Sequence, residues 1–95
     1  MFAVVGTWTM DSEMRAQQAS MLPQLVAGVS QNPGFRRGFW AEDVEDPGLS
    51  VTFIVFDTLP QARAFREAVT ANSPAQADAG VSRDGLRIVQ IRADA

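Results

Sequence analysis

The sequence predicts an α+β, ferredoxin-like domain with the order β-α-β-β-α-β, in which two helices cover a four-stranded antiparallel sheet. Three observations predict this fold class. Four short runs are rich in β-branched and aromatic residues, two longer segments have helical spacing of their apolar residues, and Gly- or Pro-containing breakers separate them. The 95 residues leave room for a single domain, which we expect to span residues 1–95.

The first two elements are a strand and a helix. Residues 2–9 form an apolar run that ends before Asp11 and Ser12, both favourable N-cap residues. Residues 13–30 then have helical spacing, and Pro23 within them removes one backbone donor, so we expect a kink or a split near Met21. The face predicted to be buried comprises Met14, Gln18, Met21, Leu22, Leu25 and Val29.

A hairpin follows. The breaker Asn32-Pro33-Gly34 ends the helix, and residues 35–43 and 49–56 read as two strands. The turn residues Glu45-Asp46-Pro47-Gly48 join them, which predicts an antiparallel pair.

A second helix and a last strand complete the order. Thr58 as N-cap and Gln61 three positions later form a capping-box pattern. We expect Asn72-Ser73-Pro74 to end this helix, residues 75–80 to add one helical turn, and residues 86–92 to form the last strand after Gly85. The predicted buried face of the helix comprises Ala62, Phe65 and Val69.

Apolar residues occupy both faces of the predicted sheet. The third strand, Val51-Thr52-Phe53-Ile54-Val55-Phe56, is apolar on both sides near its end, whereas two helices can cover only one face. Soluble monomers avoid a large exposed apolar patch, so we expect a homodimer formed by sheet-to-sheet packing. The alternative is a monomer that uses the second face as a ligand groove.

Two segments carry a resemblance to a known family. The run Asn32-Pro33-Gly34-Phe35-Arg36-Arg37-Gly38-Phe39-Trp40 resembles the entry to the second strand of antibiotic biosynthesis monooxygenase-like proteins. The run from Phe53 through Asp57-Thr58 to Ala62 and Phe65 resembles their third strand and following helix. The resemblance implies a dimeric α/β barrel with a cavity between sheet and helices. It also implies a possible cofactor-independent monooxygenase acting on a planar phenolic or polyketide-like molecule.

This sequence departs from the chemically understood relatives. It has no His and therefore no axial haem ligand, it has no Tyr, and Phe56 stands where many relatives have Trp. With no His or Cys, classical triads, thiolate nucleophiles and the usual zinc ligands are excluded. We therefore expect no cofactor and no metal, and the catalytic residues stay unknown.

Five residues are the candidates for contacting a small aromatic ligand. Trp8 and Trp40 can wall a cavity and donate a hydrogen bond, although aromatic residues in strands also form plain core or dimer interface. Arg37, like Arg92, can neutralise a phenolate or form a surface ion pair. The candidate substrate-binding set is Trp8, Arg37, Trp40, Phe65 and Gln90.

Charge and hydropathy exclude further classes. The net charge is −3 and the eight basic residues are scattered, so we expect no nucleic-acid partner. The acidic residues Glu42, Asp43, Glu45 and Asp46 are interpreted as a solvated turn and not as a cation site. No signal peptide or membrane span is recognised, so we expect a cytoplasmic protein.

Three hypotheses for function remain open. The first is a cofactor-independent monooxygenase, and the second is a dimer that binds a small molecule without changing it. The third is a purely structural dimer, which predicts that Trp8 and Trp40 are packed in the dimer interface.

Overall fold

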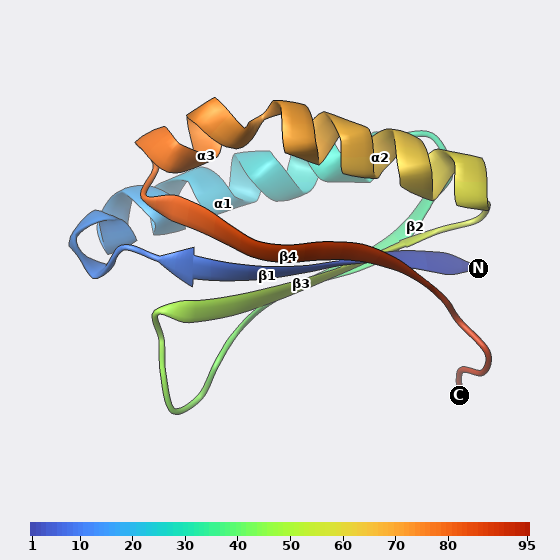
Figure 1. Ribbon diagram of the computed structural model, residues 1–95, viewed down its shortest axis with the longest axis horizontal. Helices are drawn as coiled ribbons and strands as arrows, with labels where there is room; N and C mark the ends of the chain where they lie inside the picture. Colours follow the sequence, from blue (N-terminus) through green and yellow to red (C-terminus); the bar gives the residue numbers. More distant parts are fainter.

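The computed structural model describes all 95 residues and confirms the ferredoxin-like α+β class (Figure 1). The strands are β1 (Phe2–Met10), β2 (Phe35–Glu42), β3 (Leu49–Phe56) and β4 (Val81–Gln90). The helical elements are the 3₁₀ turn η1 (Ser12–Met14), α1 (Arg15–Ser30), α2 (Leu59–Ala71) and α3 (Ser73–Asp78). None of these helices has both the length and the apolar character needed to cross a membrane.

The sheet has the order β2-β3-β1-β4, and every neighbouring pair is antiparallel. All helices lie on one side of it (Figure 1). Directly paired residues point to the same face, so the pairings of Val4 with Ile54 and of Gly6 with Thr52 define the side that the helices cover, here the helix face. The opposite side, here the open face, carries Val5 and its partner Phe53.

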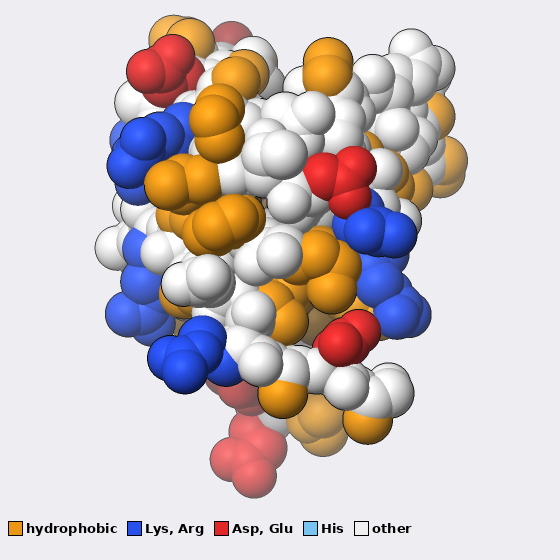
Figure 2. Space-filling model, turned by 90° about the vertical axis from the view of Figure 1, so that its right-hand side faces the viewer, with side chains coloured by type: hydrophobic (Ala, Val, Ile, Leu, Met, Phe, Trp, Pro, Cys, Tyr) orange, Lys and Arg blue, Asp and Glu red, His pale blue; other side chains and the backbone are white.

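The core occupies the half of the helix face where β1 begins and β3 ends. Phe56 is fully buried at its centre, with its ring 5.1 Å from Phe65 and 6.3 Å from Phe35, centroid to centroid. An end view from the side of the N-terminus shows hydrophobic side chains reaching the surface between arginine side chains on both flanks (Figure 2). The buried core cluster comprises Val4, Val29, Ile54, Phe56, Ala62 and Phe65.

Helix α2 agrees closely with its prediction. The Thr58 hydroxyl accepts from the Gln61 backbone N–H at 3.4 Å, and the Gln61 side chain accepts from the Thr58 N–H at 3.2 Å. This capping box fixes the start of the helix and thereby the face that it turns to the sheet. Ala62 and Phe65 are buried and Val69 is half-buried, as the spacing predicts.

Helix α1 differs from its prediction in two ways. It runs through Pro23 as one helix, because the proline removes a single bond while the other turns and the Asn32 side chain, which donates to the Val29 carbonyl at 3.0 Å, hold its length. Half of its predicted buried face is uncovered, although Val29 is buried and Met14 and Gln18 are half-buried. Met21, Leu22 and Leu25 are 40–49% exposed, because α1 packs on the edge strand β2 and not on the sheet centre.

Strand β4 begins at Val81 and not at residue 86, and it ends at Gln90. Ser82, Arg83 and Asp84 near its start are polar, so the sequence pattern did not distinguish this stretch from a loop. A bulge makes the early pairing possible: Gly85 pairs with Thr7 and Arg83 with Trp8, which leaves Asp84 outside the ladder. The Asp84 carboxylate accepts from the Thr9 hydroxyl at 2.6 Å.

Gly28 offers a direct test of the α1 assignment. A Cβ added there meets no atom within 4 Å, so Gly28→Ala is expected to raise the free energy of unfolding by about 0.5–1 kcal/mol through helix propensity. Urea denaturation followed by circular dichroism measures it. The matched Gly34→Ala should destabilise instead, because Gly34 has φ +80° and its Cβ would overlap the Gln61 side chain. A loss of stability in Gly28→Ala would contradict the assignment.

Candidate functional site

The helix face holds a small cluster of polar and aromatic groups beyond the core, toward the hairpin end of the sheet. Trp8 lies on β1, Thr52 on β3 and Trp40 on β2, and we term these three residues the Trp–Thr–Trp cluster. Thr52 is the cross-strand partner of Trp40 on one side and of Gly6 on the other. The cluster therefore spans three adjacent strands on one face of the sheet.

Trp8 is fixed in place. Its indole N–H donates to the Thr52 hydroxyl at 3.0 Å, and the residue is 9% exposed. The ring folds back over Gly6, where a Cβ would lie 2.6 Å from the Trp8 Nε1. Both contacts require a residue without a side chain at Gly6, so the short Gly6-Thr7-Trp8 segment positions the indole.

Trp40 is held less tightly. It is half-buried and packs against the core cluster from the edge strand β2. Its ring covers Gly38, where a Cβ would lie 2.9 Å from the Trp40 Cζ3. Unlike Trp8, it hydrogen-bonds no protein group through its indole.

Thr52 is the residue that sequence reasoning missed. Its hydroxyl accepts from Trp8 but donates to no protein group, so its own proton is available. Thr52 lies on β3, one of the two central strands, yet it is only half-buried, which means that the helix layer leaves it accessible. A signal existed in the sequence: Thr52 shares its strand face with Ile54 and Phe56 and is a hydroxyl in an apolar row.

The buried interior of the protein carries no charge. No polar or charged residue is buried, and no buried side-chain nitrogen or oxygen lacks a hydrogen-bond partner. The two ion pairs, Arg15–Glu42 at 2.7 Å and Arg36–Asp57 at 2.9 Å, are half-exposed on the surface. The side chains of the cluster thus offer aromatic surface and neutral donors to a ligand, and the acidic residues Glu42, Asp43 and Asp84 line a hollow beside Trp8.

The other predicted site residues lie in three different places. Phe65 contacts Phe56 in the core, next to the cluster, and Gln90 is exposed at the end of β4. Arg37 lies on the open face, paired with Val55, and its guanidinium is 5.0 Å from the centroid of the Phe39 ring. Arg37 is therefore separated from the two indoles of its own chain by the sheet.

The predicted alternative that puts both indoles in a sheet-to-sheet interface is wrong for this fold. Trp8 and Trp40 point to the helix face, whereas such an interface would use the open face. The physical reason is strand register, because the pairings of Thr52 place both indoles on the side of Ile54 and Phe56.

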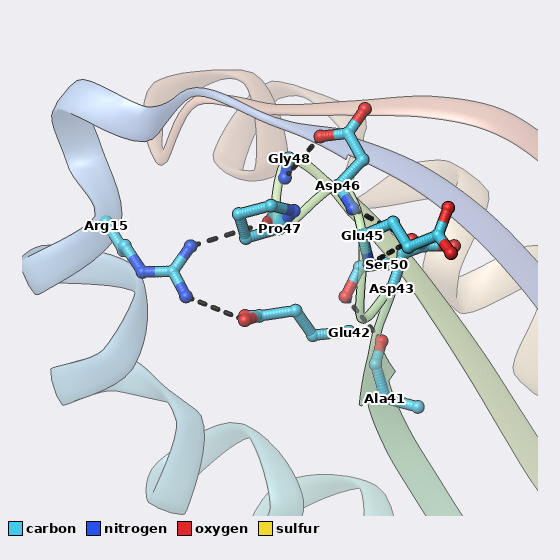
Figure 3. A network of polar contacts seen from close by, with 9 residues as sticks. All are labelled: Arg15, Ala41, Glu42, Asp43, Glu45, Asp46, Pro47, Gly48 and Ser50. Carbon is cyan, nitrogen blue, oxygen red and sulfur yellow. Dashed lines mark hydrogen bonds and ion pairs between the residues drawn. The ribbon is translucent and has the colours of Figure 1, made fainter.

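The acidic hairpin is a hydrogen-bonded turn, as predicted (Figure 3). The Asp43 carboxylate accepts from the backbone N–H groups of Glu45 and Asp46 at 2.9 Å, and the Asp46 carboxylate accepts from Gly48 at 3.0 Å. Arg15 at the start of α1 donates to the Glu42 carboxylate. The carboxylates thus serve the turn, and no group of three or more potential metal ligands converges anywhere in the chain.

The open face carries apolar side chains and one shallow hollow, and a second hollow lies at the hairpin end of the sheet. Phe39, Leu49 and Val51 are exposed there, and Val5 and Phe53 are half-buried. One hollow of about 260 Å³ is lined by Val5, Thr7, Gly85, Leu86 and Arg87. The other, of about 230 Å³, lies at the hairpin end of the sheet and is lined by Thr7, Trp8, Ala41, Glu42, Asp43, Leu49, Ser50, Val51 and Asp84.

No protein-family model matches the sequence, and no curated protein matches it. Solved structures do match. A Deinococcus radiodurans protein named as a candidate antibiotic biosynthesis monooxygenase is 22% identical, with a TM-score of 0.74 over 100% of this chain and 94% of the other. SnoaB from Streptomyces nogalater, a cofactor-independent oxygenase, is 20% identical, with a TM-score of 0.73 over 98% and 94%.

A further structure extends the comparison. A candidate antibiotic biosynthesis monooxygenase from Nitrosomonas europaea is 15% identical, with a TM-score of 0.75 over 98% of this chain and 100% of the other. At these identities the likeness concerns the fold, and it covers almost the whole of each chain. The family resemblance seen in the sequence is thereby confirmed in three dimensions: this chain has the fold of the antibiotic biosynthesis monooxygenase proteins.

Proposed function

We propose that the protein is a cofactor-independent monooxygenase that oxidises a planar phenolic or polyketide-like molecule at the Trp–Thr–Trp cluster. One observation carries the proposal: the half-buried Thr52, whose hydroxyl has a proton to donate, shares one face of the sheet with the indoles of Trp8 and Trp40, and no charged residue is buried. Such a site suits a flat, electron-rich ligand that carries an oxygen. The cofactor-independent oxygenase among the solved structures of this fold supports the same chemistry.

The reaction uses the substrate's own electrons. An anthrone-type substrate loses a proton from its methylene carbon to water and becomes a delocalised anion, which reduces molecular oxygen. The methylene becomes a carbonyl that keeps one oxygen atom, and the other oxygen leaves as water. The protein supplies two things: the indoles orient the flat rings, and Thr52 donates a hydrogen bond to the oxygen on which the anion's charge gathers.

The proposed working form is a homodimer joined through the open faces. The exposed Phe39, Leu49 and Val51 are the apolar groups that a second copy would cover. The dimer leaves the helix face free, so each chain keeps its own Trp–Thr–Trp cluster. In this arrangement Arg37 belongs to the subunit contact and not to its own chain's substrate.

Oxygen consumption tests the activity. We expect the purified protein to accelerate oxygen uptake by anthrone-type substrates above the buffer rate, with formation of the corresponding quinone and no added cofactor. A panel of one-, two- and three-ring phenols and anthrones defines the substrate size. Rates equal to the uncatalysed rates across the whole panel would overturn the monooxygenase proposal.

Thr52→Val is the sharpest active-site change. It keeps the shape of the side chain but removes the hydroxyl, which is both the proposed donor to the substrate and the acceptor of the Trp8 N–H. We expect kcat/KM for an anthrone to fall roughly 10- to 100-fold, the value of a hydrogen bond to a charged group. Thr52→Ser keeps the hydroxyl and is the matched control. Oxygen-uptake kinetics measure both, and a Thr52→Val rate within about twofold of wild type would contradict the role.

A non-catalytic dimer that binds a small aromatic ligand is the second candidate. The absence of any buried charged group favours it, because general acid–base chemistry has no residue to work through here. It predicts a ligand that raises the melting temperature and is recovered unchanged. Thermal shift with chromatographic analysis of the ligand separates this candidate from the monooxygenase.

A further inference from the structure

The two tryptophans of the cluster stand in the same short motif. Gly6-Thr7-Trp8 on β1 and Gly38-Phe39-Trp40 on β2 both place a glycine two residues before an indole. Positive φ occurs at two other glycines, Gly34 and Gly80, so Gly6 and Gly38 are not required by the backbone. A glycine inside a strand weakens it, which leaves close approach of the indole as the physical reason for both.

The two rings lie over their glycines in opposite orientations. The nitrogen edge of Trp8 faces Gly6, where a Cβ would meet Nε1 at 2.6 Å and Cε2 at 2.8 Å. The benzene edge of Trp40 faces Gly38, where a Cβ would meet Cζ3 at 2.9 Å and Cη2 at 3.0 Å. Cζ3 is the indole atom farthest from Nε1, so the Trp40 N–H lies at the end of the ring away from Gly38.

Because of these orientations, the two indole N–H groups have different hydrogen-bonding roles. Trp8 uses its N–H inside the protein, on Thr52. Trp40 donates to no protein group, and because no side-chain nitrogen is both buried and unpartnered, its N–H reaches the surface of the half-buried residue. Trp8 is therefore a structural indole, and Trp40 is the indole with a donor to offer.

We propose that Trp40 recognises a carbonyl or phenol oxygen of the ligand through its indole N–H, and that Gly38 is the positioning residue that aims this donor. The inference rests on the proposed function, since it concerns the same cluster. Trp40 and Thr52 are direct cross-strand partners, so the two residues that carry free donors are neighbours on the helix face. The ligand class that fits is a planar polycycle with acceptor oxygens along one edge.

Gly38 controls the direction of the Trp40 N–H, because there is no space for a larger side chain at position 38. An alanine Cβ would press on the Trp40 ring at 2.9 Å and on the Ile54 Cδ1 at 3.0 Å. Ile54 is buried in the core, so the Trp40 ring must move instead. The displaced ring keeps its apolar area but points its N–H elsewhere.

Two matched ligands test the inference by calorimetric titration. Anthraquinone-2-sulfonate has carbonyl acceptors, and anthracene-2-sulfonate has the same rings and sulfonate without them. In wild type we expect the quinone to bind more tightly. In Trp40→Phe and in Gly38→Ala the quinone should bind about 3- to 10-fold more weakly, as loss of one neutral hydrogen bond predicts, while the hydrocarbon changes by less than about twofold.

The controls distinguish a change in the direction of the Trp40 N–H from a general loss of packing. Gly28→Ala, which meets no neighbouring atom, should leave both affinities unchanged. Equal weakening of both ligands in Trp40→Phe and Gly38→Ala would assign these residues a packing role and overturn the inference, as would an unchanged preference for the quinone. In either case the proposed function stands. Failure of wild type to bind either ligand would overturn the inference and the proposed function together.

Discussion

Val51→Glu is expected to convert the proposed dimer into a monomer. Val51 is 43% exposed at the open face on the central strand β3, where a sheet-to-sheet contact would bury it. A carboxylate there loses its water without gaining a partner, so we expect the dimer dissociation constant to rise by more than about 100-fold. Light scattering after size-exclusion chromatography should report 10.3 kDa for the variant and twice that mass for wild type.

Val44→Glu is the matched control. Val44 is 98% exposed on the acidic hairpin, so the same substitution adds the same charge outside the proposed interface. We expect Val44→Glu to keep the wild-type mass. A wild-type protein that is monomeric at all concentrations, or a Val51→Glu protein that stays dimeric, would refute the open-face dimer.

Phe56→Ala is expected to have the largest effect on stability. Phe56 is fully buried between Phe35 and Phe65, and truncating it removes both ring contacts and leaves a cavity. The expected loss is about 3–5 kcal/mol, a large part of the whole stability of a small domain. Chemical denaturation monitored by circular dichroism measures it.

Phe56→Leu gives the graded comparison. It keeps most of the apolar volume, so we expect a loss below about 1.5 kcal/mol. A Phe56→Ala protein that unfolds within about 1 kcal/mol of wild type would show that the rings around Phe56 do not form the centre of the core.

Local signals predicted much of the fold. The capping box of Thr58 and Gln61 and the hairpin turn at residues 43–48 are short-range patterns, and the structure confirms both. Long-range packing was not predictable in the same way. Leu22 and Leu25 have the spacing of a buried face, but what lies beneath a helix depends on the sheet, and here the sheet ends at β2.

In the candidate site, too, local features could be predicted and long-range contacts could not. Trp40 and Arg37 are an odd number of residues apart on one strand, so strand alternation alone predicts that they point to opposite faces of the sheet. The hydrogen bond between Trp8 and Thr52 could not be predicted from the sequence, because it depends on strand register and on an indole that folds back over Gly6. The early start of β4 was also hidden, since its bulge places polar residues in the ladder.

The alternation of β3 has a consequence for how this protein can change over evolutionary time. Thr52 faces the helices, and its neighbours Val51 and Phe53 face the other way, so one stretch of chain carries the proposed site and the proposed dimer surface on alternate residues. Inserting a single residue into β3 would exchange the two sets and damage both properties at once. The hairpin at residues 43–48 contributes to neither face of the sheet, and insertions that lengthen the chain should accumulate there.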